Sequence, residues 1–272
     1  MEKKKGLKVF MSIDIEGING ICNWDETEHD DPRYEQFRRE LQEEVKHDCI
    51  GAHEAGATEI LIKDAHDSAR NLEILYLPEY CSLLRGWDGQ PCSMMAGLDS
   101  SFDAVMFVGY HSPSRSGGNS LSHTMNSSRV YEVTINGEIA SEFTINSLYA
   151  SYLGVPVAFL AGDENLTHLV KKANENIETV ASKVGHHGAV LSKNPKVTWK
   201  EIEEGAKKGL EKCTKKNIVK LPKHFDVEVA YKYHNNAYNS SFFPGCKLID
   251  SDRISFSSDN YWDTLVMLKF TL

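Results

Sequence analysis

The sequence predicts an α/β fold: a mostly parallel sheet flanked by helices in residues 1–190, with a smaller α+β portion in residues 191–272. Two observations support this prediction. Short apolar runs rich in β-branched residues alternate with segments of helical periodicity, which is typical of βαβ units and a parallel sheet. The chain also has 272 residues, 41% of them hydrophobic and 25% charged, enough to form one large domain or two unequal ones.

The first predicted βαβ unit connects a strand in Lys8–Gly17 to a strand in Thr58–Lys63. Between them, residues 18–31 are polar and turn-rich, so we expect a loop there. Apolar residues at helical spacing then predict a helix in Arg33–Ala55, which Gly56 closes. Two strands joined by a helix imply parallel pairing and a right-handed crossover.

The middle of the chain extends the same sheet with two longer apolar strands, Asp103–Tyr110 and Val155–Leu160. The Asn136-Gly137 dipeptide between them indicates a hairpin turn. The shorter elements expected in this region are strand pieces at Leu72–Leu77 and Cys81–Leu84, a hairpin arm at Val130–Ile135 and a helix at Glu138–Leu153.

The character of the chain changes after the fourth long strand. The irregular, Gly- and Pro-containing stretch His186–Val197 is the expected boundary between the two portions. No internal repeat is present. The remaining expected elements are helices at Asn165–Asn176, Trp199–Cys213 and Tyr261–Leu272, and strands at Thr179–Gly185, Phe225–Tyr233 and Lys247–Phe256.

Composition excludes several classes of partner. The net charge of −9 disfavours nucleic acid and anionic membrane, both of which require a basic face. The opening residues 1–8 lack the apolar core of a signal peptide, and no run of about 18 apolar residues exists to span a membrane. The six cysteines are scattered without close pairs, which disfavours a thiolate zinc site or a disulfide scaffold. We therefore expect a cytoplasmic protein with reduced thiols.

Metal-type ligands follow three of the predicted parallel strands. Asp14 and Glu16 end the first strand, His66 follows the second, and His111 follows the third. A further carboxylate, Glu142, lies on the predicted helix. Because ligands bind beyond the carboxyl ends of strands in open α/β sheets, these side chains are expected at one edge. Mixed carboxylate and imidazole donors suit zinc, manganese or cobalt, and a pair of such ions usually shares a bridging carboxylate, for which Asp14 is the natural candidate.

Six short segments, in order along the chain, resemble the zinc-dependent D-aminopeptidase family of the dipeptide-transport-operon type. They are SIDIEG (12–17), KDAH (63–66), GYH (109–111), SHTM (122–125), SEFTIN (141–146) and AGDE (161–164). Each segment is short, and their order and number make the resemblance specific.

The resemblance implies a binuclear zinc aminopeptidase in which Asp14 bridges two ions, Glu16 and His66 complete one site, and His111 and Glu142 complete the other. It also implies that His123 is the catalytic histidine, described for the family as nucleophile or acid/base. We favour the acid/base role, because a zinc-bound water is already an adequate nucleophile. The family further implies ring-stacked homo-oligomers, commonly decamers.

The expected reaction is removal of the N-terminal residue, a D-amino acid, from short peptides by a metal-bridging water. One alternative is a related metal-dependent peptidase or amidase that prefers L-peptides or peptide amides. Another is a non-catalytic peptide-binding protein, which would bind peptides without turnover.

Several polar residues near the motifs have two interpretations each. Asp64 would orient His66 or cap the strand end. Asn146, one helical turn after Glu142, is expected to fix that carboxylate rather than to bind substrate. Asp163 is expected to be the N-cap of the next helix. Cys22 lacks the basic partner that a thiolate nucleophile requires.

Overall fold

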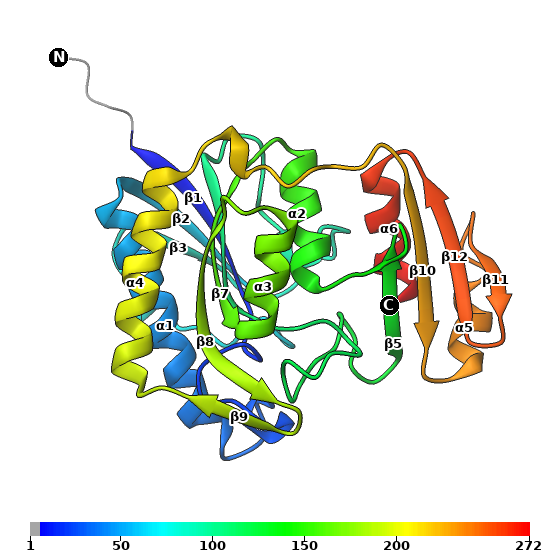
Figure 1. The fold of residues 1–272 in the computed structure, drawn as a ribbon, viewed down its shortest axis with the longest axis horizontal. Helices are drawn as coiled ribbons and strands as arrows, with labels where there is room; N and C mark the ends of the chain where they lie inside the picture. The colour runs from blue at the N-terminus through cyan, green and yellow to red at the C-terminus, as the bar shows by residue number, and fades with distance from the viewer. Residues whose placement is uncertain (1–5) are drawn as a thin grey trace.

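The computed structural model describes residues 6–272, and the basic opening at residues 1–5 lies outside the described residues (Figure 1). Seven strands form the larger sheet, in the order β3-β2-β1-β4-β7-β8-β9. All neighbouring pairs are parallel except β8 and β9. The strands are β1 Leu7–Ile13, β2 Ala57–Asp64, β3 Cys81–Leu84, β4 Ala104–Tyr110, β7 Val157–Asp163, β8 Glu178–His186 and β9 Ala189–Ser192.

A second, antiparallel sheet lies beside the first, with five strands in the order β11-β12-β10-β5-β6. In Figure 1 it occupies the right-hand part of the molecule, together with the C-terminal helix α6. Its strands are β5 Val130–Ile135, β6 Glu138–Ile139, β10 Phe225–Tyr231, β11 Lys247–Asp250 and β12 Arg253–Ser258.

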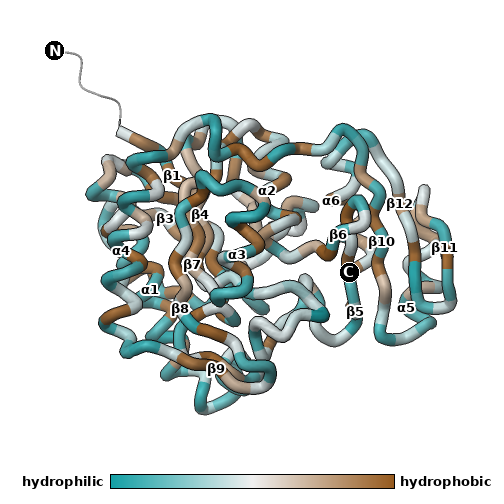
Figure 2. The backbone as a smooth tube through the Cα atoms, in the orientation of Figure 1, coloured by the Kyte–Doolittle hydropathy of each residue, from teal (hydrophilic) through white to brown (hydrophobic). Residues whose placement is uncertain are grey.

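Helices cover both faces of the larger sheet, which confirms the predicted α/β class. One apolar cluster joins α1 and α4 to one face of the sheet, and a second joins the other face to α2, α3, α6 and the five-stranded sheet. Figure 2 shows the hydrophobic strands enclosed by helices of mixed hydropathy. The helices are α1 Tyr34–Glu54, α2 Glu142–Tyr152, α3 Glu164–Ala173, α4 Pro195–Lys212, α5 His234–Ser240 and α6 Tyr261–Thr271.

The two sheets do not divide the chain at residue 190. Helix α4, which follows that position, packs against α1 on the larger sheet, whereas β5 and β6, which precede it, belong to the smaller sheet. The stretch expected to be an irregular boundary, His186–Val197, contains the β8–β9 hairpin and the start of α4. The predicted division into 1–190 and 191–272 therefore does not follow the sheets, and as a statement about separate folding units it stays a prediction.

Two further local predictions are corrected by the structure. The segment Leu72–Leu77 is not a strand, and Ile74–Tyr76 form a 3-10 turn whose side chains are exposed and have no sheet partner. The helix expected from Glu138 begins only at Glu142, because Asn136 and Gly137 both have positive φ and turn the chain into β6. Such turns favour a hairpin, and the Ser141 hydroxyl then caps the helix.

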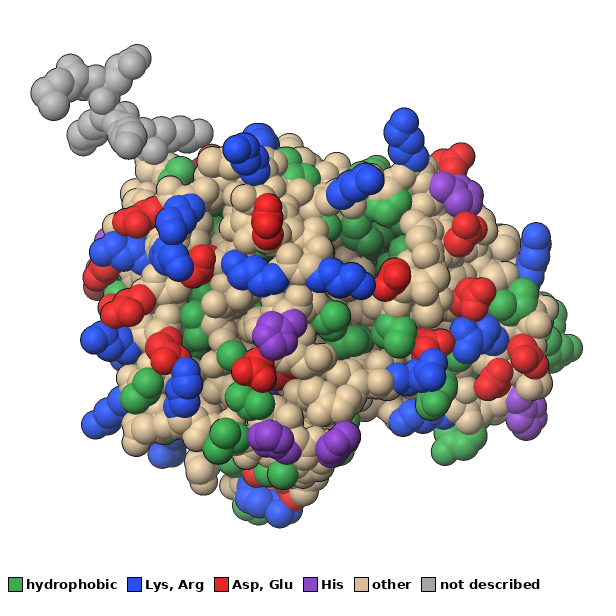
Figure 3. Space-filling model, viewed as in Figure 1, with side chains coloured by type: hydrophobic (Ala, Val, Ile, Leu, Met, Phe, Trp, Pro, Cys, Tyr) green, Lys and Arg blue, Asp and Glu red, His purple; other side chains and the backbone are tan. Residues whose placement is uncertain are grey.

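The surface carries both signs of charge. On the face seen in Figure 3, basic and acidic side chains are interspersed over the helices and the smaller sheet. Among residues 6–272, no helix is both long and apolar enough to cross a membrane.

Candidate metal centre

The order of strands creates a crevice where the candidate ligands lie. From β1 the chain moves outward to β2 and β3, and then returns to place β4 on the other side of β1. The carboxyl ends of β1 and β4 therefore form a topological switch point, which is where open α/β sheets bind ligands. Asp14 and Glu16 follow β1, and His111 follows β4.

Two glycines bring these strand ends into contact. Gly17 donates its backbone N–H to the Gly109 carbonyl at 2.7 Å. A Cβ atom at Gly17 would lie 1.9 Å from the Tyr110 carbonyl oxygen, and one at Gly109, whose φ is +73°, would lie 2.1 Å from that of Asp14. Only residues without a side chain fit such an approach.

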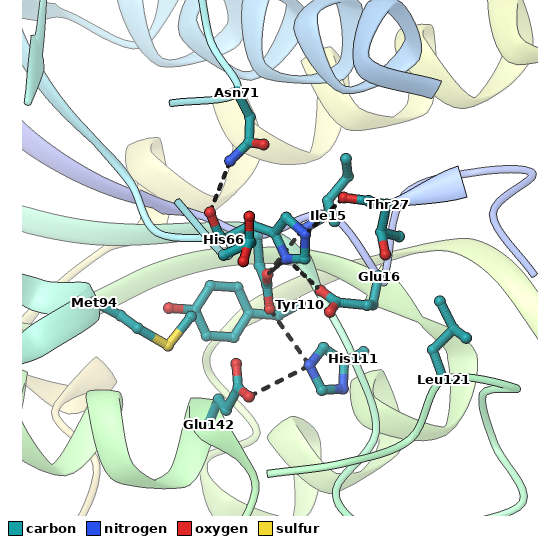
Figure 4. Close-up of polar contacts among 12 residues, drawn as sticks. Ile15, Glu16, Thr27, His66, Asn71, Met94, Tyr110, His111, Leu121 and Glu142 are labelled. Atoms are coloured by element: carbon teal, nitrogen blue, oxygen red, sulfur yellow. Dashed lines mark hydrogen bonds and ion pairs between the residues drawn. The ribbon is translucent and has the colours of Figure 1, made fainter. Parts of the chain in front are cut away.

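The structure brings together all five residues predicted as metal ligands, and His123 with them. The donor atoms form three groups of three, and within each group the atoms lie within 4.8 Å of one another. The first group is Asp14, Glu16 and His66; the second is Asp14, His111 and Glu142; the third is Glu16, His111 and His123. Asp14 is thus common to two groups that match the two predicted sites. Figure 4 shows His66 directed toward Glu16, and His111 toward Glu142.

The closest approaches link each imidazole to the carboxylates. His66 Nδ1 lies 3.4 Å from Asp14 Oδ1 and 3.2 Å from Glu16 Oε2. His111 Nε2 lies 3.4 Å from Asp14 Oδ2 and 3.5 Å from Glu142 Oε1. All of these side chains are buried.

Backbone carbonyls fix which ring nitrogen faces the cluster. His66 Nε2 lies 3.1 Å from the Thr27 oxygen, and His111 Nδ1 lies 2.9 Å from the Ser112 oxygen. Since a carbonyl only accepts hydrogen bonds, each of these nitrogens carries a proton. The other nitrogen of each ring then faces the carboxylates, which is the arrangement that metal-binding histidines show.

The donor set fits metal cations. Asp14 Oδ2, Glu16 Oε2 and His111 Nε2 are buried and have no hydrogen-bond partner among the described residues, despite approaches of 3.2 to 3.5 Å within the cluster. Burying a charged atom without a partner costs folding free energy. A bound metal cation would give these carboxylate and imidazole atoms a partner. Carboxylates and imidazoles are donors that zinc accepts.

The pKa values reflect the concentration of buried charge. Burial, reinforced by Glu16 and Glu142, raises the pKa of Asp14 well above its usual value. Burial works against ionisation of Glu142, yet His111 holds its pKa at about 2. In return, although burial opposes its charged form, Glu142 raises the pKa of His111 to about 10. The carboxylates therefore require positive charge nearby, which either imidazole protons or metal cations supply.

His123 occupies a different position from the other two histidines. Its ring stacks on His111, with centroids 4.3 Å apart, and meets Trp24 edge to face at 5.2 Å. Its Nδ1 lies 2.9 Å from the Leu121 carbonyl oxygen, so Nδ1 carries the proton and Nε2 faces Glu16 and Glu142 at 3.8 and 3.6 Å. Burial, together with the charge of His111, lowers the pKa of His123.

A set of polar contacts holds the ligand-bearing loops. Asp163 is the N-cap of α3, as predicted, and it also accepts hydrogen bonds from Ser112 N and Oγ, which follow His111. The buried Lys183 donates to the Glu16 carbonyl at 2.6 Å. These hydrogen bonds fix the backbone next to His111 and at Glu16, which limits how far the two side chains can move.

Other predicted roles near the ligands are corrected or refined. Among the described residues, Asp64 makes no hydrogen bond to the His66 ring; it accepts from Asn71, whose Nδ2 also donates to the His66 carbonyl at 2.9 Å. Asn146 does not fix Glu142, because its Nδ2 donates to the Tyr110 hydroxyl at 2.9 Å. Burial raises the pKa of Cys22, which does not suit a thiolate nucleophile.

Three residues at the site escape sequence reasoning. Tyr110 ends the apolar strand β4, and its hydroxyl accepts a hydrogen bond from Asn146. Lys183 is a fully buried lysine within β8, and Trp24 is a large aromatic in a loop otherwise polar. Tyr110 adjoins His111 within the GYH segment, whereas Lys183 and Trp24 lie outside the six family segments and come close to the cluster only through the tertiary fold.

An α/β sheet with clustered acids and histidines at its switch point is typical of metal-dependent hydrolases. The model of the D-aminopeptidase family matches residues 7–270. The chain therefore belongs to the D-aminopeptidase family and is a hydrolase of the aminopeptidase class.

A sequence comparison and a structure comparison both support this assignment. A D-aminopeptidase of Bacillus subtilis (strain 168) is 28% identical over 243 residues, which cover 89% of this chain and 88% of that protein. The fold is also similar to a solved structure described as the Zn-dependent D-aminopeptidase DppA from Bacillus subtilis, a self-compartmentalizing protease. That structure has a TM-score of 0.89 and 26% sequence identity, and the match covers 97% of this chain and 96% of the other.

Proposed function

We propose that this protein is a binuclear zinc aminopeptidase that releases the N-terminal D-amino acid from short peptides. The observation that carries the proposal is the pair of donor groups that share Asp14. Asp14, Glu16 and His66 would hold one zinc ion, and Asp14, His111 and Glu142 the other. The solved relative described as zinc-dependent supports zinc as the metal.

The zinc ions, when bound, would supply a water of lowered pKa and polarise the scissile carbonyl. The protein supplies the positions of the donors and the exclusion of bulk water from a buried cluster. Glu28 and Asp67, two carboxylates that line the cavity and are not proposed zinc ligands, would suit the free amine of a peptide and so favour removal of an N-terminal residue over cleavage of an internal bond.

His123 is proposed as the acid/base group. With Nδ1 committed to the Leu121 carbonyl, Nε2 accepts a proton from the attacking water and returns it to the leaving nitrogen as the peptide C–N bond breaks. The lowered pKa of His123, caused by burial and by His111, keeps the ring neutral and able to accept that proton.

We further propose that the protein acts as a ring-stacked homo-oligomer in the cytoplasm. The description of the solved relative as self-compartmentalizing supports an assembly whose sites face an enclosed space. The six cysteines are all free, which suits a reducing compartment.

The test is amino-acid release from matched D- and L-alanyl dipeptides by zinc-loaded protein. We expect the wild type to release the amino acid from the D-dipeptide. We expect Asp14→Ala to lose both this activity and its bound zinc. Preference for the L-dipeptide would move the function to a related peptidase, and tight binding of both peptides without release would indicate a peptide-binding protein. Activity in Asp14→Ala would contradict the metal centre.

A further inference from the structure

Two cavities meet at the candidate centre. The inner cavity, of about 360 Å³, is lined by Asp14, Glu16, His66 and Glu142 among others. The outer cavity, of about 700 Å³, extends away from the cluster. Both cavities have four lining residues in common, so they adjoin, and the two together are called the cleft below. These residues are Trp24, Glu28, His123 and Ser127.

The two ends of this cleft are lined by different kinds of charged side chain. The inner cavity is lined by carboxylates and histidines, and none of its lining residues is a lysine or arginine. The outer cavity is lined by Arg115 and Lys232 together with several serines, and its one acid, Glu28, lies at the junction. A ligand that spans the cleft therefore meets fixed cationic side chains at the outer end, whereas the inner end holds the proposed zinc ligands and has no lysine or arginine.

Arg115 has donor capacity left for a ligand. Its Nη1 donates to Glu132, and its guanidinium lies 5.5 Å from the centre of the Tyr131 ring. Among residues 6–272, this side chain makes no other hydrogen bond, and it is 46% exposed. Its φ of 62° holds the backbone in an uncommon conformation for a residue with a side chain. The remaining nitrogens of the planar guanidinium suit a carboxylate, which they can bind in bidentate fashion.

Lys232 connects the outer cavity to the junction. Its Nζ donates to the Ser127 carbonyl at 2.6 Å, and its backbone N–H donates to the Arg129 carbonyl at 2.9 Å. Ser127 is one of the residues lining both cavities. The ammonium group is therefore fixed beside the junction and keeps further protons for a ligand oxygen.

We propose that Arg115 and Lys232 bind the C-terminal carboxylate of the substrate, so that the enzyme prefers short peptides whose carboxyl terminus is free. The peptide amine would lie toward the inner cavity, whose lining includes Asp67, a carboxylate outside the proposed zinc ligands, and the cleft would select zwitterionic peptides over peptide amides. This inference rests on the proposed aminopeptidase function and specifies its substrate class. Cationic side chains at the outer end alone also favour one direction of binding for the peptide.

The experiment compares alanyl-alanine in its D form with the C-terminal amide of the same dipeptide, using zinc-loaded enzyme. The wild type is expected to hydrolyse the free acid with a kcat/KM roughly tenfold or more above that of the amide, since a charge-assisted contact is lost in the amide. Arg115→Gln and Lys232→Met are each expected to lower this ratio toward one, mainly by raising KM for the free acid. Arg115→Lys, which keeps the charge, should restore part of the ratio.

Arg253→Gln is the matched control. Arg253 donates to the same Glu132, at 3.1 Å, but does not line the outer cavity. Its loss should leave the ratio between acid and amide as in the wild type. An equal fall in Arg253→Gln would assign the effect to the Glu132 contacts, and this would overturn the proposal. Equal kcat/KM for acid and amide in the wild type would also overturn it, while leaving the aminopeptidase function intact.

Calorimetric titration of the same two ligands separates this inference from the proposed function. If neither ligand is hydrolysed, tighter binding of the free acid that depends on Arg115 would still support the carboxylate site and would contradict the aminopeptidase. Equal affinity for acid and amide in that case would overturn both.

Discussion

The backbone N–H of Met125 donates a hydrogen bond of 2.7 Å to Glu142 Oε1. Met125 has a φ of 64°, which is uncommon for a residue with a side chain. This contact joins the loop that carries His123 to the first turn of α2, which carries Glu142. The same hydrogen bond therefore fixes the loop of the proposed acid/base group and the side chain of a proposed zinc ligand.

Glu142→Gln tests the ligand role of this carboxylate. The amide oxygen can still accept from Met125, but the charge that a metal requires is lost. We expect the variant to fold, to lose bound zinc on dialysis, and to have a kcat/KM lower by roughly 100-fold or more. Metal analysis and kinetics check this. Glu138→Gln, at an exposed site on β6, is the control; full zinc content in Glu142→Gln would contradict the assignment.

His123→Asn tests whether the third histidine is an acid/base group or a ligand. As an acid/base group, its loss should lower kcat by roughly 100- to 10,000-fold and remove one limb of the pH–rate profile. Zinc content should stay at the wild-type level. Since His123 also lies within one donor group with Glu16 and His111, a variant that loses zinc would make it a ligand instead.

Removal of metal should destabilise the whole protein. Three buried carboxylates, Asp14, Glu16 and Glu142, lie close together, and a cation that binds only the folded chain stabilises it by mass action. We expect a chelator to lower the melting temperature and added zinc to restore it. Asp14→Asn has one carboxylate fewer to neutralise. In this variant the melting temperatures with chelator and with added zinc should therefore differ by less than in the wild type. If the chelator does not change the melting temperature of the wild type, tight binding of a metal by the folded protein is excluded.

Stability should also depend on pH through Glu44, a buried residue of α1. Burial raises its pKa to about 8 from an ordinary value of 4.5. The folded state therefore retains a proton that the unfolded chain releases, so this contribution is fully present below pH 4.5 and is lost as the pH rises through about 8. The ionised form at higher pH is the destabilising one.

Glu44→Gln cannot ionise and keeps an acceptor for the Asn19 N–H. Its melting temperature should be close to that of the wild type near pH 4.5 and roughly 5 °C or more above it at about pH 9. Glu43→Gln, a surface change on the same helix, should show no such difference between the two pH values. A constant offset for Glu44→Gln at both pH values would show that ionisation is not the cause.

The fold class was predictable because strand patterns are local. Apolar runs such as Asp103–Tyr110 are visible in the sequence, and parallel strands end at a common edge, so the meeting of Asp14, His66 and His111 followed from their positions alone. Glu142 and His123 required the family resemblance, because a helix and a loop have no fixed place relative to a sheet edge.

Contacts between distant segments were not predictable. Asn146 lies one turn from Glu142, and helical spacing favours an interaction between them. In the structure Asn146 Nδ2 instead donates its hydrogen bond to the hydroxyl of Tyr110, at the end of strand β4. Lys183 likewise contacts the Glu16 carbonyl across a sequence separation of 167 residues. The sequence contains no local pattern for either contact, because the partner is brought near by the sheet.

The contact between Gly17 and Gly109 constrains how this sequence can change. A side chain at either position would push the ends of β1 and β4 apart and would separate Asp14 from His111, although neither ligand had been altered. A substitution at one glycine cannot be compensated at the other, because both already lack a side chain. In a library of random variants, these two positions should therefore tolerate as little change as the ligands themselves, although they offer no atom to a metal.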